Sequence, residues 1–163
     1  MATKDEVFSS KVKHKGIWKY SDVYAMVFDW LKTNKYDVGE GLYKEVAGEG
    51  KDIDIEWEAE KKVTDYFKFV INIKWKIIGM KDAEVEVDGK VQKMNKGEIG
   101  FTIKAYLVSD YDGKWDGKPM NKLFRGIYEK YIIDSNVKQY KGKLEDETVE
   151  LIEDIKSFLR IGA

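Results

Sequence analysis

The residues that could carry out chemistry are few and scattered along this chain of 163 residues. His14 is the only histidine, and an imidazole that faces the protein interior could serve as an acid or a base. A metal site would need further ligands, and the chain has neither a second histidine nor a cysteine to supply them. We therefore predict no catalytic residue, no metal site and no cofactor, and keep His14 as a candidate for contact with a ligand.

The segment DYDGKWDG, residues 110–117, superficially resembles a calcium-binding loop because it contains Asp110, Asp112 and Asp116. The EF-hand spacing requires an oxygen ligand at position 114 and a glutamate at position 123, where this chain has lysine and leucine. Clusters of aspartate and glycine are also common in turns. We interpret the segment as a loop.

Carboxylates alternate along residues 52–60, a pattern that could place paired acids for glycoside hydrolysis. The positions between them hold Ile53, Ile55, Trp57 and Ala59. Because successive side chains of a strand point to opposite faces, this alternation indicates a strand with one buried apolar face and one solvated acidic face. We prefer that interpretation to paired catalytic acids.

The stretch YFKFVINIKWKIIG, residues 66–79, is the element around which the other elements are expected to pack. Its alternate positions are apolar: Phe67, Phe69, Ile71, Ile73, Trp75 and Ile77. A helix would scatter these six side chains around its axis, whereas a strand puts them on one face. The pattern predicts a long central strand in which Ile73 and Trp75 are buried, while Lys74 and Lys76 are exposed.

The remaining pattern predicts a strand at residues 6–15 and a helix at 21–34, with Ser21 as N-cap and Asn34 in the left-handed conformation at its end. From residue 42 to 108 it predicts an antiparallel meander. The turns of this meander are placed at residues 48–50, 62–65, 88–89 and 95–97. Asp88-Gly89 favours a tight type I′ turn.

The register between the acidic strand and the central strand follows from parity. Directly opposed residues share a face, so the sum of their residue numbers must be even if buried residues oppose buried ones. A sum of 128 sets Trp57 opposite Ile71 and is preferred for its short turn. A sum of 130 sets Trp57 opposite Ile73 and is the alternative.

The C-terminal part is predicted to contain a helix that begins near Pro119 and carries Phe124, a polar connector at residues 134–142, and a last helix at 144–161. The predicted fold is a single α+β domain over residues 1–163. It has a curved antiparallel sheet of about six strands, one helix after the first strand, and two C-terminal helices packed on the sheet.

Composition restricts the classes of function. The 29 basic and 30 acidic residues nearly cancel, and Arg125 and Arg160 are the only arginines, which argues against nucleic acid as a partner. The N-terminal residues lack the apolar run of a signal peptide, and the chain has no stretch of 18 apolar residues. We expect a cytoplasmic protein that does not insert into a membrane.

The order of elements, a strand, a helix, antiparallel strands and C-terminal helices, resembles the helix-grip arrangement of the START-like superfamily. The resemblance rests on this order alone. It implies a curved sheet that wraps around a long C-terminal helix, with an apolar cavity between them. Related proteins bind lipids, sterols, aromatic products or protein partners, so the fold leaves the ligand open.

The candidate ligand-binding residues are mostly aromatic and are expected to face the layer between sheet and helices. They are Trp57, Phe69, Trp75, Phe101, Phe28, Trp30 and Phe124, together with His14. As packed core these rings need no further explanation, and we prefer that interpretation. As the lining of a cavity they would hold an apolar ligand.

We expect a non-enzymatic binding domain for an apolar small molecule or a protein partner, which uses the space or face between sheet and helices. One alternative is a cavity enzyme that acts on an apolar substrate through His14 or a buried carboxylate. Another is a nucleic-acid-binding module. Its lysines would be Lys11, Lys13, Lys15, Lys74 and Lys76.

Overall fold

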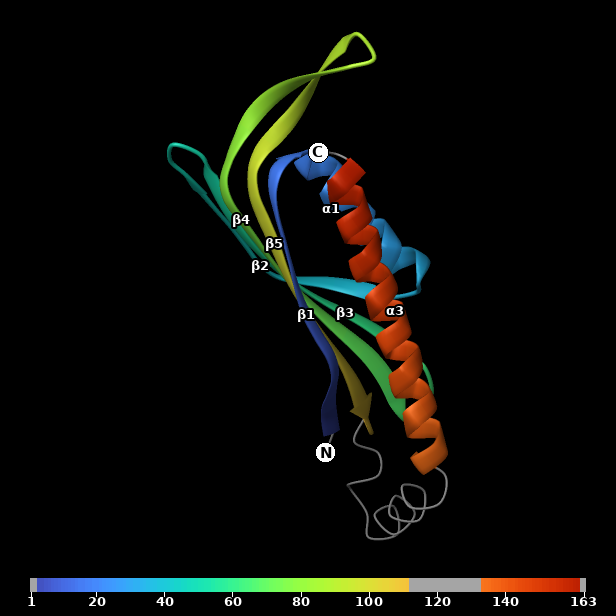
Figure 1. Cartoon of the computed structure of the whole chain (residues 1–163). Coiled ribbons are helices and arrows are strands. Elements are labelled where there is room, and N and C mark those ends of the chain that lie inside the picture. The colour runs from blue at the N-terminus through green and yellow to red at the C-terminus, as the bar shows by residue number, and fades with distance from the viewer. Residues whose placement is uncertain (1–2, 112–132, 162–163) are drawn as a thin grey trace.

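The structure is a computed structural model, and it describes residues 3–111 and 133–161. Five antiparallel strands form one sheet in the order β1-β5-β4-β3-β2. The strands are β1 (Thr3–Trp18), β2 (Asp37–Ala47), β3 (Lys51–Lys62), β4 (Phe67–Val87) and β5 (Lys90–Ser109). Helices α1 (Tyr20–Thr33) and α3 (Ile133–Ile161) cover the inner face of this curved sheet (Figure 1). The predicted α+β class, with a helix after the first strand and a long C-terminal helix, is confirmed.

The central strand of the sheet is β4, and its predicted alternation is confirmed. Ile73 and Trp75 are 0% and 1% exposed, whereas Lys74 and Lys76 are exposed to solvent. The inner-face residues of the strands form one core together with residues of both helices. The fully buried helix residues of that core include Val23, Val27, Leu31, Leu144, Leu151 and Ile155. The apolar face of the sheet is therefore the surface on which both helices pack.

The sum of opposed residue numbers between β3 and β4 is even, as predicted, and its value is 130. Trp57 lies opposite Ile73, so the preferred sum of 128 was wrong and its alternative is confirmed. The cause is the turn, which a side chain stabilises. The Thr64 hydroxyl oxygen accepts hydrogen bonds from the backbone N–H groups of Tyr66 at 3.0 Å and Phe67 at 2.9 Å. The turn is displaced by one residue from the one assumed, since the Val63 N–H donates to the Phe67 carbonyl oxygen at 3.0 Å and residues 64–66 lie between them.

The type I′ turn at Asp88-Gly89 is confirmed, with φ values of 50° and 79°. The turn at residues 95–97 was wrong, because β5 runs through it without a break. The irregularity lies instead in β4, between Ile78 and Lys81, where Gly79 has a φ of 64°. Because β5 is one long strand, the sheet has five strands in the described residues instead of about six.

The bounds of the first helix lie within one residue of the prediction, but both predicted caps were wrong. The residue before α1 is Lys19 and its side chain makes no capping bond; the N–H of Tyr20 donates instead to the side-chain oxygen of Asn95 at 2.8 Å. At the other end Asn34 has a φ of −88°, and Lys35 is the residue with positive φ, at 71°. The Asn34 side chain still contributes, since its amide donates to the Trp30 carbonyl at 2.8 Å.

The last helix is longer than predicted, because α3 begins at Ile133 and residues 134–142 are helical. Val137 and Tyr140 in this segment pack against the core, and the Tyr140 ring lies 5.2 Å from that of Phe67. These contacts extend the apolar stripe of α3 toward its N-terminal end, so the prediction of a polar connector at residues 134–142 was wrong. The helix predicted near Pro119, with Phe124, lies outside the described residues.

Candidate functional site

The structure brings four of the predicted ligand-binding residues together in one aromatic cluster. Trp57, Trp75 and Phe101 lie on the neighbouring strands β3, β4 and β5, with ring centroids 5.0 and 4.8 Å apart. Phe28 of α1 packs on the rim at 6.1 Å from Trp57 and is 38% exposed. Tyr24, which the sequence analysis did not single out, fills the centre at 4.9 Å from Trp57. These rings contact one another directly, as expected for packed core.

The other predicted rings lie apart from this cluster. Trp30 stacks on Tyr36 with ring centroids 6.2 Å apart, and Phe69 lies on β4 near the side chain of Lys61. Phe124 falls outside the described residues. His14 lies on the inner face of β1 opposite Ile99, and its buried Nε2 has no hydrogen-bond partner among the described residues. The predicted site is therefore at least two separate groups.

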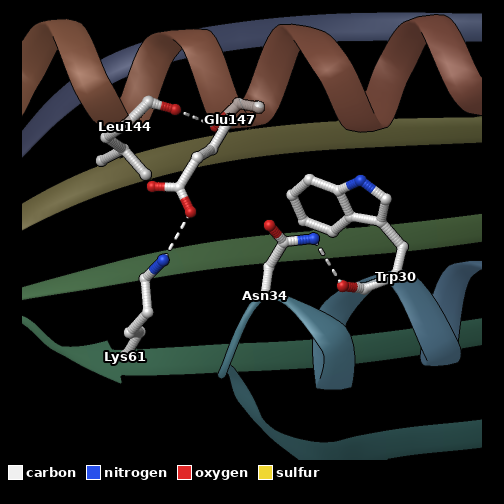
Figure 2. A network of polar contacts seen from close by, with 6 residues as sticks. Trp30, Asn34, Lys61, Leu144 and Glu147 are labelled. Carbon is white, nitrogen blue, oxygen red and sulfur yellow. Dashed lines mark hydrogen bonds and ion pairs between the residues drawn. The ribbon is translucent and has the colours of Figure 1, made fainter.

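A buried polar network surrounds the second group, where β3 meets α3 (Figure 2). Lys61 Nζ forms an ion pair with Glu147 Oε1 and lies 4.6 Å from the centre of the Tyr36 ring. Three buried polar atoms near this pair have no hydrogen-bond partner among the described residues. They are Trp30 Nε1, the Tyr36 hydroxyl oxygen and Glu147 Oε2. A buried polar group without a partner is costly, so such groups are often kept for a ligand or a switch.

Electrostatics keep the Tyr36 hydroxyl neutral. Burial raises the pKa of Tyr36 well above its usual range, and the carboxylate of Glu147 raises it further. The Lys61 ammonium group faces both residues, so it neutralises Glu147 while its charge lies over the Tyr36 ring. The network therefore contains a neutral hydroxyl, an indole N–H and one Glu147 oxygen that have no hydrogen-bond partner among the described residues.

A surface groove lies beside this network, between α1 and α3, and its volume is about 650 Å³. Residues at helical spacing on the two helices face each other across it: Met26, Asp29, Trp30 and Thr33 on α1, and Glu150, Asp154, Ser157 and Phe158 on α3, with Asn34 at one end. Figure 2 shows Asn34 between Trp30 and the Lys61–Glu147 pair, so the groove and the network share this corner of the protein.

The floor and the rim of the groove differ in character. Met26 and Phe158 are partly buried and Trp30 is 9% exposed, so apolar side chains make up the floor. The rim carries three exposed carboxylates, Asp29, Glu150 and Asp154. No lysine or arginine is among the described residues that line it. Figure 2 shows the indole nitrogen of Trp30 on the ring edge toward α3.

The carboxylates of residues 52–60 provide no comparable site. Along β3 the acidic side chains lie on the outer face, where Glu56 pairs with Lys74 at 3.8 Å and Glu60 with Lys68 at 3.1 Å. The hydrogen bond from Lys68 lowers the pKa of Glu60. Asp112 and Asp116 lie outside the described residues. Within residues 3–111 and 133–161 no group of acidic or histidine side chains is arranged to hold a metal ion.

Sequence reasoning found Trp30 but missed Tyr36, Lys61 and Glu147. One signal for Lys61 was present, because it continues the odd-numbered, inward series of β3.

In the part of the chain that is described, neither helix has the length and apolar character that crossing a bilayer requires. A scan against protein-family models, a search of curated proteins and a search of solved structures each find no match to this chain.

Proposed function

We propose that this chain is a non-enzymatic binding domain of the START-like, helix-grip type, which takes an apolar small molecule carrying a positive charge in the groove between α1 and α3. The observation that carries the proposal is the groove itself, about 650 Å³ in volume with an apolar floor and an acidic rim. Small-molecule sites typically have volumes of about 300–1,000 Å³ and are lined mostly by apolar groups with a few polar ones.

The floor of the groove supports an apolar ligand body. Met26, Trp30 and Phe158 present flexible and aromatic surfaces, which adapt to a hydrocarbon or ring system. Trp30 is 9% exposed and its indole nitrogen is buried, so its ring contributes apolar surface to the floor of the groove. Burial of apolar ligand surface contributes about 25 cal/mol per Å² before the entropy cost of binding is subtracted.

The rim supports a positive charge on the ligand. Asp29, Glu150 and Asp154 form no ion pair with any described residue, so their charges are not cancelled locally. An ammonium group about 4 Å from one of these carboxylates gains about 1 kcal/mol in bulk water and about 4 kcal/mol at the effective dielectric of a protein surface. An anionic ligand with the same apolar body would be repelled by the same three groups.

Two surfactant probes with the same tail and opposite charge test the proposal. Decyltrimethylammonium and decyl sulfate are titrated separately into the protein by calorimetry, both below the concentration at which they form micelles. We expect the cation to bind at least tenfold more tightly, a difference of about 1.4 kcal/mol. Equal affinity for both probes, or tighter binding of the sulfate, would contradict the proposed cation site.

Variants test whether the surfactant probes bind in the groove. Glu150→Gln and Asp154→Asn are each expected to weaken binding of the cation about fivefold, equivalent to about 1 kcal/mol. Glu145→Gln removes a charge from an exposed position of α3 that does not line the groove, so it should leave binding unchanged. Ser157→Trp should fill the groove and abolish binding of both probes. If all four variants behave alike, the probes bind elsewhere.

A further inference from the structure

The outer face of the sheet, opposite the helices, has a hollow of about 520 Å³. Its centre is formed by Gly100 and Thr102 of β5. Four of the five lysines in its lining flank these two residues, Lys11 and Lys13 on β1 and Lys74 and Lys76 on β4; the fifth, Lys44, lies on β2. We call Gly100, Thr102 and the four flanking lysines the lysine hollow. The three strands lie side by side in the sheet order, so the hollow is built on rigid secondary structure.

The strand register sets the positions of the four lysines. Lys13 and Lys76 lie on either side of Gly100, and Lys11 and Lys74 lie on either side of Thr102. Successive even-numbered positions of β4 and β5 share the outer face, so the four ammonium groups rise around one short segment of β5. Gly100 has no side chain to fill the space between Lys13 and Lys76, which leaves the floor open.

Most of this positive charge is not cancelled by neighbouring carboxylates. Lys74 forms an exposed ion pair with Glu56 at 3.8 Å. Lys11, Lys13 and Lys76 form no ion pair with any described residue. The acidic members of the lining, Asp54 and Glu56, both lie on β3 at one side. The half of the hollow over β1, β5 and β4 is therefore strongly basic, although the whole chain is nearly neutral.

We propose that the lysine hollow binds a compact polyanion of the oligophosphate class. Three or four ammonium groups match the charge of a short phosphate chain, and the Thr102 hydroxyl can donate a hydrogen bond to one of its oxygens. The volume suits a small molecule. Trp75 and Phe101 belong to the lining, but they are 1% and 2% exposed, and the Trp75 ring packs against Phe101 and against Tyr24 of α1 on the inner side of the sheet. Neither ring is therefore available as the stacking platform that single-stranded nucleic acid uses.

This site is independent of the groove between the helices, since the two lie on opposite faces of the sheet. The lysine hollow contains four of the five lysines that the sequence analysis considered for nucleic acid, and we assign a smaller ligand to them. A solvated lysine surface would attract any anion in proportion to the charge of that anion. Binding in a defined site would depend in addition on the open space above Gly100, and this difference can be tested.

Titration calorimetry with inorganic tripolyphosphate at about 10 mM salt is the primary measurement. We expect saturable binding of one anion per chain. Raising the salt to about 150 mM shortens the Debye length from about 30 Å to about 8 Å, so the affinity should fall severalfold. Absence of binding to the wild-type protein at low salt would overturn the proposal.

Two kinds of variant separate a built hollow from diffuse attraction. Lys13→Gln and Lys76→Gln should each weaken tripolyphosphate binding about fivefold, while Lys104→Gln, on the same outer face but outside the hollow, should have little effect. Gly100→Val keeps every charge and fills the floor. A Cβ at Gly100 meets nothing closer than 3.6 Å, so this variant is expected to fold.

Gly100→Val should abolish binding of tripolyphosphate while leaving the thermal unfolding midpoint at or above the wild-type value. The attraction is diffuse, and the proposal is wrong, if two results are found together. Gly100→Val would bind tripolyphosphate as tightly as the wild type, and Lys104→Gln would weaken binding as much as Lys13→Gln does. A single-stranded oligothymidylate serves as the second probe. Tighter binding of that probe than of tripolyphosphate, unaffected by Gly100→Val, would show a nucleic-acid surface and would also overturn the proposal.

Discussion

Lys61 on β3 and Glu147 on α3 form an ion pair that joins the sheet to the C-terminal helix, with 16% and 13% of their side chains exposed. The pair is largely removed from water, which costs free energy for both charges. Lys61 recovers part of that cost through the Tyr36 and Phe69 rings, whose centres lie 4.6 and 5.5 Å from its Nζ. The pair therefore fixes where α3 lies on the sheet more than it adds to stability.

Removing one member of this pair should be far more damaging than removing both. Lys61→Met leaves the Glu147 carboxylate buried without a counter-charge, and we expect the free energy of unfolding to fall by about 3 kcal/mol. The double variant Lys61→Met with Glu147→Leu should regain most of that loss. Urea unfolding of the singles and the double, analysed as a double-mutant cycle, gives the coupling free energy.

The exposed pair Lys74 and Glu56 on the outer face is the matched control, because its side chains are 65% and 49% exposed. Its coupling free energy should be below about 1 kcal/mol. A double variant of Lys61 and Glu147 that is as unstable as the worse single variant would mean that the network depends on charge at both positions.

The Tyr36 hydroxyl should make the protein less stable in alkaline solution. Burial raises the folded-state pKa of Tyr36, whereas in the unfolded chain a tyrosine ionises near pH 10. Below pH 10 both states hold the proton and stability is unaffected by this group. Above pH 10 the unfolded state loses the proton first, so the free energy of unfolding falls by up to about 1.4 kcal/mol per pH unit.

Tyr36→Phe removes this dependence and keeps the ring that Trp30 and Lys61 contact. At pH 7 the variant should be within about 1 kcal/mol of the wild type, since the hydroxyl has no partner among the described residues. From pH 10 to 11 its stability should decline less steeply. Denaturation curves collected across this range decide the matter, and parallel curves for the two proteins would refute the assignment to Tyr36.

The inner face of the sheet could be predicted from the sequence because a strand repeats every two residues. The parity of Phe67 to Ile77 identified the buried face of β4, and the same parity restricted the β3–β4 register to two choices. The choice between them depended on Thr64, whose hydroxyl accepts two backbone hydrogen bonds in the turn. Such a local hydrogen bond cannot be predicted from composition or from periodicity.

The errors elsewhere come from contacts between residues distant in the sequence. The start of α1 depends on Asn95, whose side-chain oxygen accepts a hydrogen bond from the N–H of Tyr20, 75 residues away in the sequence. The ion pair of the candidate site joins residues 86 positions apart, and Glu147 is one of several acids on its helix. Lys61 alone carried a usable signal, a charged residue in an inward-facing strand position.

Gly89 tests the hairpin between β4 and β5, which extends beyond the helices (Figure 1). Its φ of 79° is readily adopted by glycine, tolerated by asparagine and strained for a β-branched residue. Gly89→Val should destabilise the hairpin by about 1 kcal/mol or more, and Gly89→Asn by much less. Amide hydrogen exchange of residues 82–96 measures this local stability. Equal protection in the two variants would show that the turn does not need positive φ.

Gly50 and Gly79 make the closest approach between the β2–β3 turn and the irregular segment of β4. A Cβ added at Gly50 would lie 2.8 Å from the carbonyl carbon of Gly79, too close for real atoms. The backbone N–H of Gly79 also donates to Asp52 at 2.8 Å, so this segment cannot move away without losing a hydrogen bond. A methyl group at position 50 must therefore displace one of the two strands.

We expect Gly50→Ala to lower the free energy of unfolding by about 1–3 kcal/mol, the usual range for forcing an extra carbon into a filled space. Gly48→Ala is the control in the same turn, because a Cβ there meets only the Gly50 carbonyl oxygen, at 3.8 Å. It should change stability by about 0.5 kcal/mol or less. Urea unfolding of both variants provides the comparison. If Gly50→Ala is no less stable than Gly48→Ala, the two backbones do not pack as closely as described.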